Sequence, residues 1–89
     1  MIMAVPGKVT WPELVHAELH ASIQIINTQR PDITFVVTLL EGEVPPSPRN
    51  GEVRVTIYFD EDGNGYEWII DPAPFITEYN APALAPTTG

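Results

Sequence analysis

Two histidines and a nearby carboxylate have the residue types and spacing of a possible metal site in this 89-residue sequence. His16 and His20 are four residues apart, and Glu13 lies three residues before His16, so on a helix all three would share one face. Two imidazoles and a carboxylate can bind a zinc ion. The order His-x-Glu-x-His is not the metalloprotease motif, however, and no further ligand is evident. The pattern favours a solvated helix face over a zinc site.

A second cluster has the ligand spacing of a calcium-binding loop. Asp60, Asp62 and Asn64 occupy alternate positions, Gly65 would allow the sharp turn, and Asp71 stands at the twelfth position. Aspartate at that position is shorter than the usual glutamate, and the flanking residues have strand patterns. Asp, Asn and Gly are also the residues that a tight turn selects. We expect a plain turn, with calcium binding as the less favoured alternative.

The composition argues against catalysis and against anionic partners. No Ser, His and Asp set and no glycine-rich phosphate loop is present, so we expect neither an enzyme nor a cofactor. Twelve acidic and four basic residues give a net charge of −8, which repels nucleic acid and anionic membranes. No cysteine is available for a disulfide. Without a visible signal peptide or an apolar run of about 20 residues, the expectation is a soluble protein of unknown compartment.

One long helix is predicted near the start of the chain. Thr10 and Glu13 have the spacing of a capping box, and Pro12 suits the first helical turn. Apolar residues then recur at intervals of four, four and three, at Val15, Leu19, Ile23 and Ile26. We therefore predict a helix over residues 10–29, ended by Pro31, with Trp11 beside the core.

Strand patterns follow this helix on both sides of a loop rich in proline and glycine. Residues 33–40 are largely β-branched or apolar, and residues 53–59 alternate between apolar and polar. A third strand is predicted at residues 66–70. The connection between the first two is longer than a usual hairpin loop, which is typical of parallel pairing or of a functional loop.

The predicted fold class is α/β (α+β), with a single helix packed on a small mixed sheet that contains a parallel strand pair. One domain is expected over residues 1–76, with a long exposed loop at about residues 43–50. Residues 77–89 are dominated by polar and small residues and are expected to form a disordered tail.

Three short motifs resemble those of the potato inhibitor I family of serine protease inhibitors. They are Trp11-Pro12-Glu13-Leu14-Val15, Leu39-Leu40-Glu41-Gly42 and Val53-Arg54-Val55. Their order and spacing extend the resemblance over roughly residues 8–60. It implies the order helix, strand, exposed protease-binding loop and parallel strand, in agreement with the elements predicted above.

The sequence departs from the family pattern at two places. His16-Ala17-Glu18 stands where the family usually has Gly-Lys-Ser or Gly-Lys-Thr before its main helix, so we expect the helix to run unbroken from Thr10. The family also carries two arginines, two residues apart, that brace the loop from below. This chain keeps Arg54, whereas Glu52 stands in place of the other arginine, or Thr56 does if the alignment is shifted.

The predicted site is the exposed loop, supported by Arg54 and Glu52. Three prolines fix φ within it, and rigidity before binding raises affinity. The loop residues are Val44, Pro45, Pro46, Ser47, Pro48, Arg49 and Asn50. The resemblance implies a monomeric inhibitor of a trypsin-like or subtilisin-like serine protease. The alternative is a non-inhibitory scaffold of the same fold whose Pro-rich loop binds another protein.

The position of the reactive bond stays open. Counting forward from Glu41-Gly42 in the family pattern selects Ser47, which is followed by a proline that has no N–H. Counting back from Arg54 selects Pro48 or Pro46. Charge alone selects Arg49, which suits a trypsin-like pocket with an acidic base. The Ser47-Pro48, Pro48-Arg49 and Arg49-Asn50 bonds thus all remain candidates.

Overall fold

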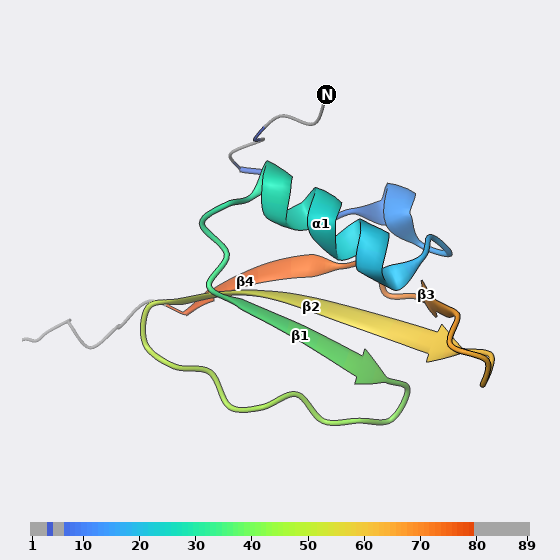
Figure 1. Ribbon diagram of the computed structural model, residues 1–89. Helices are drawn as coiled ribbons and strands as arrows, with labels where there is room; N and C mark the ends of the chain where they lie inside the picture. Colours follow the sequence, from blue (N-terminus) through green and yellow to red (C-terminus); the bar gives the residue numbers. More distant parts are fainter. Residues whose placement is uncertain (1–3, 5–6, 80–89) are drawn as a thin grey trace, which may run out of the picture.

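The computed structural model describes residue 4 and residues 7–79, and in this part of the chain one helix packs on one face of a four-stranded mixed sheet (Figure 1). This arrangement confirms the predicted fold class and the parallel strand pair. The elements in chain order are a 3-10 helix at Pro12–Leu14, α1 at Leu19–Gln29, β1 at Phe35–Leu40, β2 at Glu52–Glu61, β3 at Glu67–Ile69 and β4 at Phe75–Tyr79. Neither described helix is long and apolar enough to cross a membrane.

Strand β2 is the centre of the sheet, because every other strand pairs with it. Its parallel neighbour is β1, with Phe35 opposite Arg54 and Leu40 opposite Phe59. On its other edge, β4 pairs antiparallel with the first half of β2 and β3 with the second half. A parallel pair requires the chain to return along the full length of the strands. The long connection between β1 and β2 makes that return.

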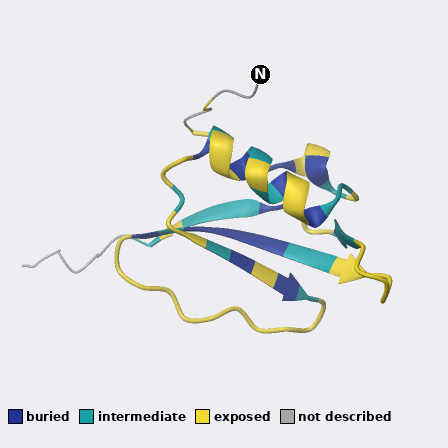
Figure 2. Cartoon of the chain, viewed as in Figure 1, coloured by how far each residue is buried: buried dark blue, intermediate teal, exposed yellow. Residues whose placement is uncertain are grey.

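The main hydrophobic core lies between α1 and the sheet (Figure 2). The side chains of Trp11, Ile26, Val55 and Ile57 are fully buried there. Of the predicted core strand, Val55 and Ile57 are therefore central, whereas its outer members Val53 and Phe59 are only half-buried. The other buried members of this core are Leu14, Leu19 and Ile69.

The predicted unbroken helix from Thr10 is wrong. The Thr10 hydroxyl donates to the Pro74 carbonyl at 3.0 Å, and the Trp11 N–H donates to the same oxygen at 3.0 Å. No side-chain hydrogen bond caps the short 3-10 helix that follows. The Thr10 hydroxyl thus bonds to the segment before β4, and no local side-chain cap forms at this helix.

His16 ends this first turn with a backbone φ of +78°, the left-handed region that glycine adopts most readily. Its N–H donates to the Ile69 carbonyl at 2.7 Å, and the Ile69 N–H donates to Ala17 at 2.9 Å. Pairing with β3 thus holds the strained residue in place. A histidine thus takes the left-handed conformation at the position where the family usually has glycine.

Glu18 caps α1 where the family has serine or threonine. Its carboxylate accepts hydrogen bonds from the backbone N–H groups of His20 at 2.9 Å and Ala21 at 2.8 Å. These two bonds, together with the nearby His20 ring, lower the pKa of the Glu18 carboxyl below its usual 4.5. The anion therefore satisfies N–H groups that the first helical turn leaves without partners.

The C-terminal strand lies where the sequence predicted the end of the domain. The expected boundary at residue 76 falls inside β4, which runs to Tyr79 and pairs with β2. The prolines at positions 72 and 74 obscured this strand, because proline is rare within a sheet. Residues 80–89 of the expected tail lie outside the described residues.

Substituting His16 by glycine tests the strain at that turn. His16→Gly should raise the free energy of unfolding by about 1 kcal/mol, because glycine removes the steric cost of a left-handed φ. His16→Ala is the control and should give no gain, since it keeps the Cβ atom. Urea denaturation measures both variants, and equal stability of the glycine and alanine variants would contradict the strain.

The Glu18 cap predicts a specific dependence of stability on pH. Because the folded-state pKa is lowered, the unfolded state binds more protons, so the cap stabilises fully above pH 4.5 and is lost as the pH falls through the folded pKa. Glu18→Ser keeps a capping oxygen without a titrating charge. The melting temperature of the wild type should therefore fall relative to that of Glu18→Ser below pH 4.5. A difference that is independent of pH would refute this role.

Candidate functional site

The loop between β1 and β2 is exposed along its whole length and has no regular secondary structure at residues 43–49 (Figure 2). Gly42 and Gly51 stand at its two ends with φ values of +89° and +81°, which side chains with a Cβ rarely adopt. At the first end, the Leu40 N–H donates to the Glu43 carboxylate at 2.6 Å. The loop therefore leaves and rejoins the sheet through defined turns.

Arg54 of β2 connects the sheet to the middle of this loop. Its Nη1 donates to the Pro46 carbonyl at 2.8 Å, and its Nη2 donates to the Ser47 carbonyl at 3.3 Å. The Arg54 side chain is only 2% exposed, although it carries a full positive charge. A buried guanidinium must have its donors satisfied, and two backbone oxygens of the loop supply part of that requirement.

The rest of the Arg54 environment comes from three different strands. Its Nε donates to the buried Glu52 carboxylate, which neutralises the charge. The rings of Phe35 in β1 and Tyr79 in β4 each lie 5.4 Å from the guanidinium carbon. Such cation–π contacts stabilise a cation that is removed from water. Tyr79 was missed in the sequence, because only the register of β4 brings it to Arg54.

Glu52 ties the far end of the loop to the same cluster. Its second carboxylate oxygen accepts a hydrogen bond from the Arg49 N–H at 3.2 Å, and its own N–H donates to the Arg49 carbonyl at 3.1 Å. Both backbone groups of Arg49 are therefore engaged in a turn at the start of β2. Glu52, which stands at one of the two positions considered for the second family arginine, thus contacts the loop through its carboxylate and its N–H.

A half-open pocket of about 520 Å³ lies between the loop and the beginning of β1. Its walls come from the middle and the second end of the loop and from the residues that enter β1. They are Thr34, Phe35, Pro46, Ser47, Arg49, Asn50, Gly51 and Glu52. The loop is therefore held by Arg54 and Glu52 and is not packed along its whole underside. Val44, Pro45 and Pro48, the other predicted loop residues, are exposed.

The candidate zinc residues do not share a helix face. His16 lies in the turn before α1, whereas His20 lies within α1, with its Nδ1 2.9 Å from Glu18 and its Nε2 3.4 Å from Glu67. The predicted arrangement on one helix is wrong, because the helix begins only at Leu19. In the described part of the chain, no three His, Cys, Asp or Glu side chains are placed to hold a metal ion.

Of the candidate calcium residues, Asp62 and Asn64 lie in the turn between β2 and β3, whereas Asp60 lies within β2 and Asp71 follows β3. The Asp62 carboxylate accepts hydrogen bonds from the N–H groups of Asn64 at 2.8 Å and Tyr66 at 3.3 Å, which closes the turn. The Asp60 carboxylate accepts from the next residue, Glu61, at 2.8 Å. One oxygen of each of these two carboxylates is therefore bonded to the backbone.

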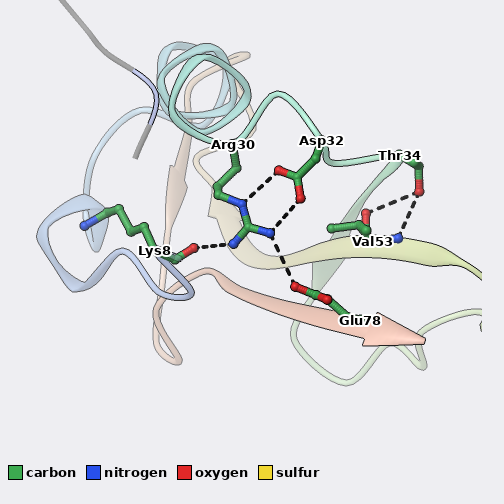
Figure 3. Close-up of polar contacts among 6 residues, drawn as sticks. All are labelled: Lys8, Arg30, Asp32, Thr34, Val53 and Glu78. Carbon is green, nitrogen blue, oxygen red and sulfur yellow. Dashed lines mark hydrogen bonds and ion pairs between the residues drawn. The ribbon is translucent and has the colours of Figure 1, made fainter. Parts of the chain in front are cut away.

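Arg30 is a second buried cation, and its role was not predicted from the sequence (Figure 3). It forms a bidentate pair with Asp32 at 2.9 and 2.8 Å, and its Nη1 donates to the Lys8 carbonyl at 2.7 Å. Its Nη2 also lies 3.5 Å from Glu78 in β4. The hydrogen bonds from Arg30 lower the pKa of Asp32. Arg30 thus joins the N-terminal arm, the end of α1 and β4.

One comparison with known proteins finds a family that matches this chain. A sequence model of the potato inhibitor I family matches residues 3–72, which include the loop, Glu52 and Arg54. No curated protein and no solved structure matches the chain. The family match therefore covers most of the chain, and the geometry of the loop comes from this structure alone.

Replacing Arg54 by lysine tests whether the two hydrogen bonds from the guanidinium fork of Arg54 hold the loop in place. Arg54→Lys keeps a positive charge beside Glu52 but lacks the planar guanidinium that bonds Glu52 and both loop carbonyls at once. The backbone order parameters of Ser47 and Arg49, measured by ¹⁵N relaxation, should fall from about 0.85 towards 0.6 or lower. Arg30→Lys is the matched control for a buried arginine and should leave these two amides unchanged. Equal loop order in wild type and Arg54→Lys would show that the fork does not restrain the loop.

Proposed function

The chain belongs to the potato inhibitor I family, and from this premise we propose that its loop at residues 43–50 inhibits serine proteases by entering the active site as a substrate would. Inhibition of serine proteases is the general activity of this family. Inhibitors of this kind act by binding and carry out no chemistry of their own. The proposal assigns the binding to the loop residues and their support to Arg54 and Glu52.

The observation that carries this proposal is the contact between the buried Arg54 guanidinium and the carbonyls of Pro46 and Ser47. A segment that is rigid before binding loses little conformational entropy when it enters a protease cleft, so more of the contact energy becomes affinity. Prolines at positions 45, 46 and 48 restrict the same segment by fixing φ. A loop that binds a protease as a substrate does must have an exposed backbone in a fixed conformation, and the bonds to Arg54 fix it here.

The same support explains how such a loop would resist hydrolysis. When a protease cuts a flexible substrate, the two new ends separate and water completes the reaction. In this protein both cut ends would stay attached to the sheet. The Arg54 guanidinium bonds to the carbonyls of Pro46 and Ser47, and the Glu52 carboxylate bonds to the Arg49 N–H. The amine would then remain beside the acyl group, and religation would compete with hydrolysis. The proposed partner is a trypsin-like or subtilisin-like serine protease, bound one-to-one by a monomer.

A second function is favoured by the exposure of the Pro-rich segment. Residues 44–48 contain three prolines and are accessible along their length, which suits recognition as an extended polyproline segment. In that case the fold would act as a scaffold that displays the loop to another protein. The two functions differ in whether a protease active site is blocked.

A panel of trypsin, chymotrypsin, elastase and subtilisin tests the proposal. At least one enzyme should be inhibited with a constant of about 1 µM or tighter, with the loop largely intact after long incubation. Arg54→Ala should turn the same chain into a faster substrate, because the loop loses its support. Circular dichroism of that variant controls for unfolding of the domain. If neither the panel nor a post-proline-cleaving serine protease is slowed, and the loop is ignored or cut at substrate-like rates, the scaffold function replaces inhibition.

A further inference from the structure

We propose that the Pro46-Ser47 peptide bond is the bond presented to the protease, and that the target protease has a primary pocket that accepts proline. This inference rests on the proposed function and adds to it the reactive bond and the class of partner. It follows from the chemistry of each bond in the loop together with the contacts of Arg54 and Glu52.

Three peptide bonds of the exposed segment are excluded as the reactive bond, because proline follows the scissile position. The bonds from Val44 to Pro45, from Pro45 to Pro46 and from Ser47 to Pro48 all have proline after the scissile position. Proline has no backbone N–H, and its ring fixes the geometry of the leaving nitrogen. Within residues 44–48, the Pro46-Ser47 bond is the one whose leaving residue keeps an N–H. Among the residues that the structure describes, that Ser47 N–H has no hydrogen-bond partner.

Arg49 is poorly placed to be the contact residue, although its charge suits trypsin. A protease holds the chain on either side of the cut bond in an extended conformation, much as a sheet edge holds an added strand, and a closed turn does not fit this requirement. The N–H and C=O of Arg49 are both bonded to Glu52. The Pro48-Arg49 and Arg49-Asn50 bonds therefore belong to the turn that starts β2.

Arg54 spans the Pro46-Ser47 bond with a single rigid guanidinium. Nη1 donates to the Pro46 carbonyl, which the protease would attack, at 2.8 Å, and Nη2 donates to the Ser47 carbonyl at 3.3 Å. Each carbonyl oxygen has a second lone pair, so the Pro46 oxygen can still accept from an oxyanion hole. In the described structure, no other peptide bond of the loop joins two residues whose carbonyls both accept hydrogen bonds from Arg54.

The chemistry at this bond is that of reversible acyl transfer. The protease serine oxygen bonds to the Pro46 carbonyl carbon, and its proton passes through the protease histidine to the Ser47 nitrogen as the C–N bond breaks. The free Ser47 amine stays next to the acyl group, because Arg54 holds both residues. Attack by that amine reforms the bond and returns the proton, which restores both proteins. The residue that enters the primary pocket is the compact, apolar Pro46.

Substitution at two prolines by arginine tests the assignment in the full chain. Trypsin has an acidic residue at the base of its primary pocket. Pro46→Arg should therefore inhibit trypsin at least about 100-fold more tightly than the wild type does. Pro48→Arg places the same charge two residues along the same loop and should give no comparable gain. Asn27→Arg, on the exposed face of α1, is the control that should leave trypsin inhibition unchanged. The wild type should inhibit a post-proline-cleaving serine endoprotease and slowly acquire a new amino terminus at Ser47, detected by mass spectrometry.

The outcomes separate the reactive bond from the proposed function. Suppose that the wild type inhibits a protease. Three results would then overturn the bond assignment and leave protease inhibition standing: a comparable tightening of trypsin inhibition by Pro48→Arg, no tighter inhibition by Pro46→Arg, or cleavage at Arg49-Asn50. Absence of inhibition of every protease by the wild type and both variants would overturn both. Ser47→Pro supplies a second check, because it should abolish cleavage after Pro46 in a chain that remains folded.

Discussion

The buried charge of Arg54 is the interaction on which the arrangement of the loop depends. Removing a guanidinium from water is costly unless its charge is paired and its donors are bonded. Glu52 pairs the charge, the rings of Phe35 and Tyr79 enclose it, and the carbonyls of Pro46 and Ser47 take two of its donors. The loop carbonyls therefore replace water as hydrogen-bond acceptors for this cation. A displaced loop would leave a buried charge partly unsatisfied.

A second buried cation does the same for the other end of the molecule. Arg30 holds the backbone of Lys8, the carboxylate of Asp32 and that of Glu78, which belong to segments far apart in sequence (Figure 3). Two of the four basic residues are thus buried, and the twelve acidic residues supply partners for them. In a chain without cysteine, these arginines join separate segments of the fold without a covalent link.

The sequence predicted those features that depend on local pattern. The β-branched residues of β1 and the alternation in β2 identify both strands, and the length of their connection identifies the parallel pairing. The start of the helix could not be predicted locally, because Thr10 and Trp11 bond to Pro74, more than sixty residues away. Tyr79 and Arg30 were missed for the same reason. Their roles arise from the register of β4 and from burial, which a single sequence does not display.

The pairing of Arg54 with Glu52 determines how the loop is supported in this chain, and the neighbouring prolines fit that support. Two buried arginines would place two positive charges under the loop, whereas Arg54 and Glu52 form a neutral pair that is easier to bury. The cost is one fewer donor to the loop, partly offset by the Arg49 N–H that Glu52 accepts. Prolines at positions 45, 46 and 48 restrict the free loop through φ. A loop with fewer accessible conformations needs fewer hydrogen bonds to hold it in one of them, so a single guanidinium is sufficient at its centre.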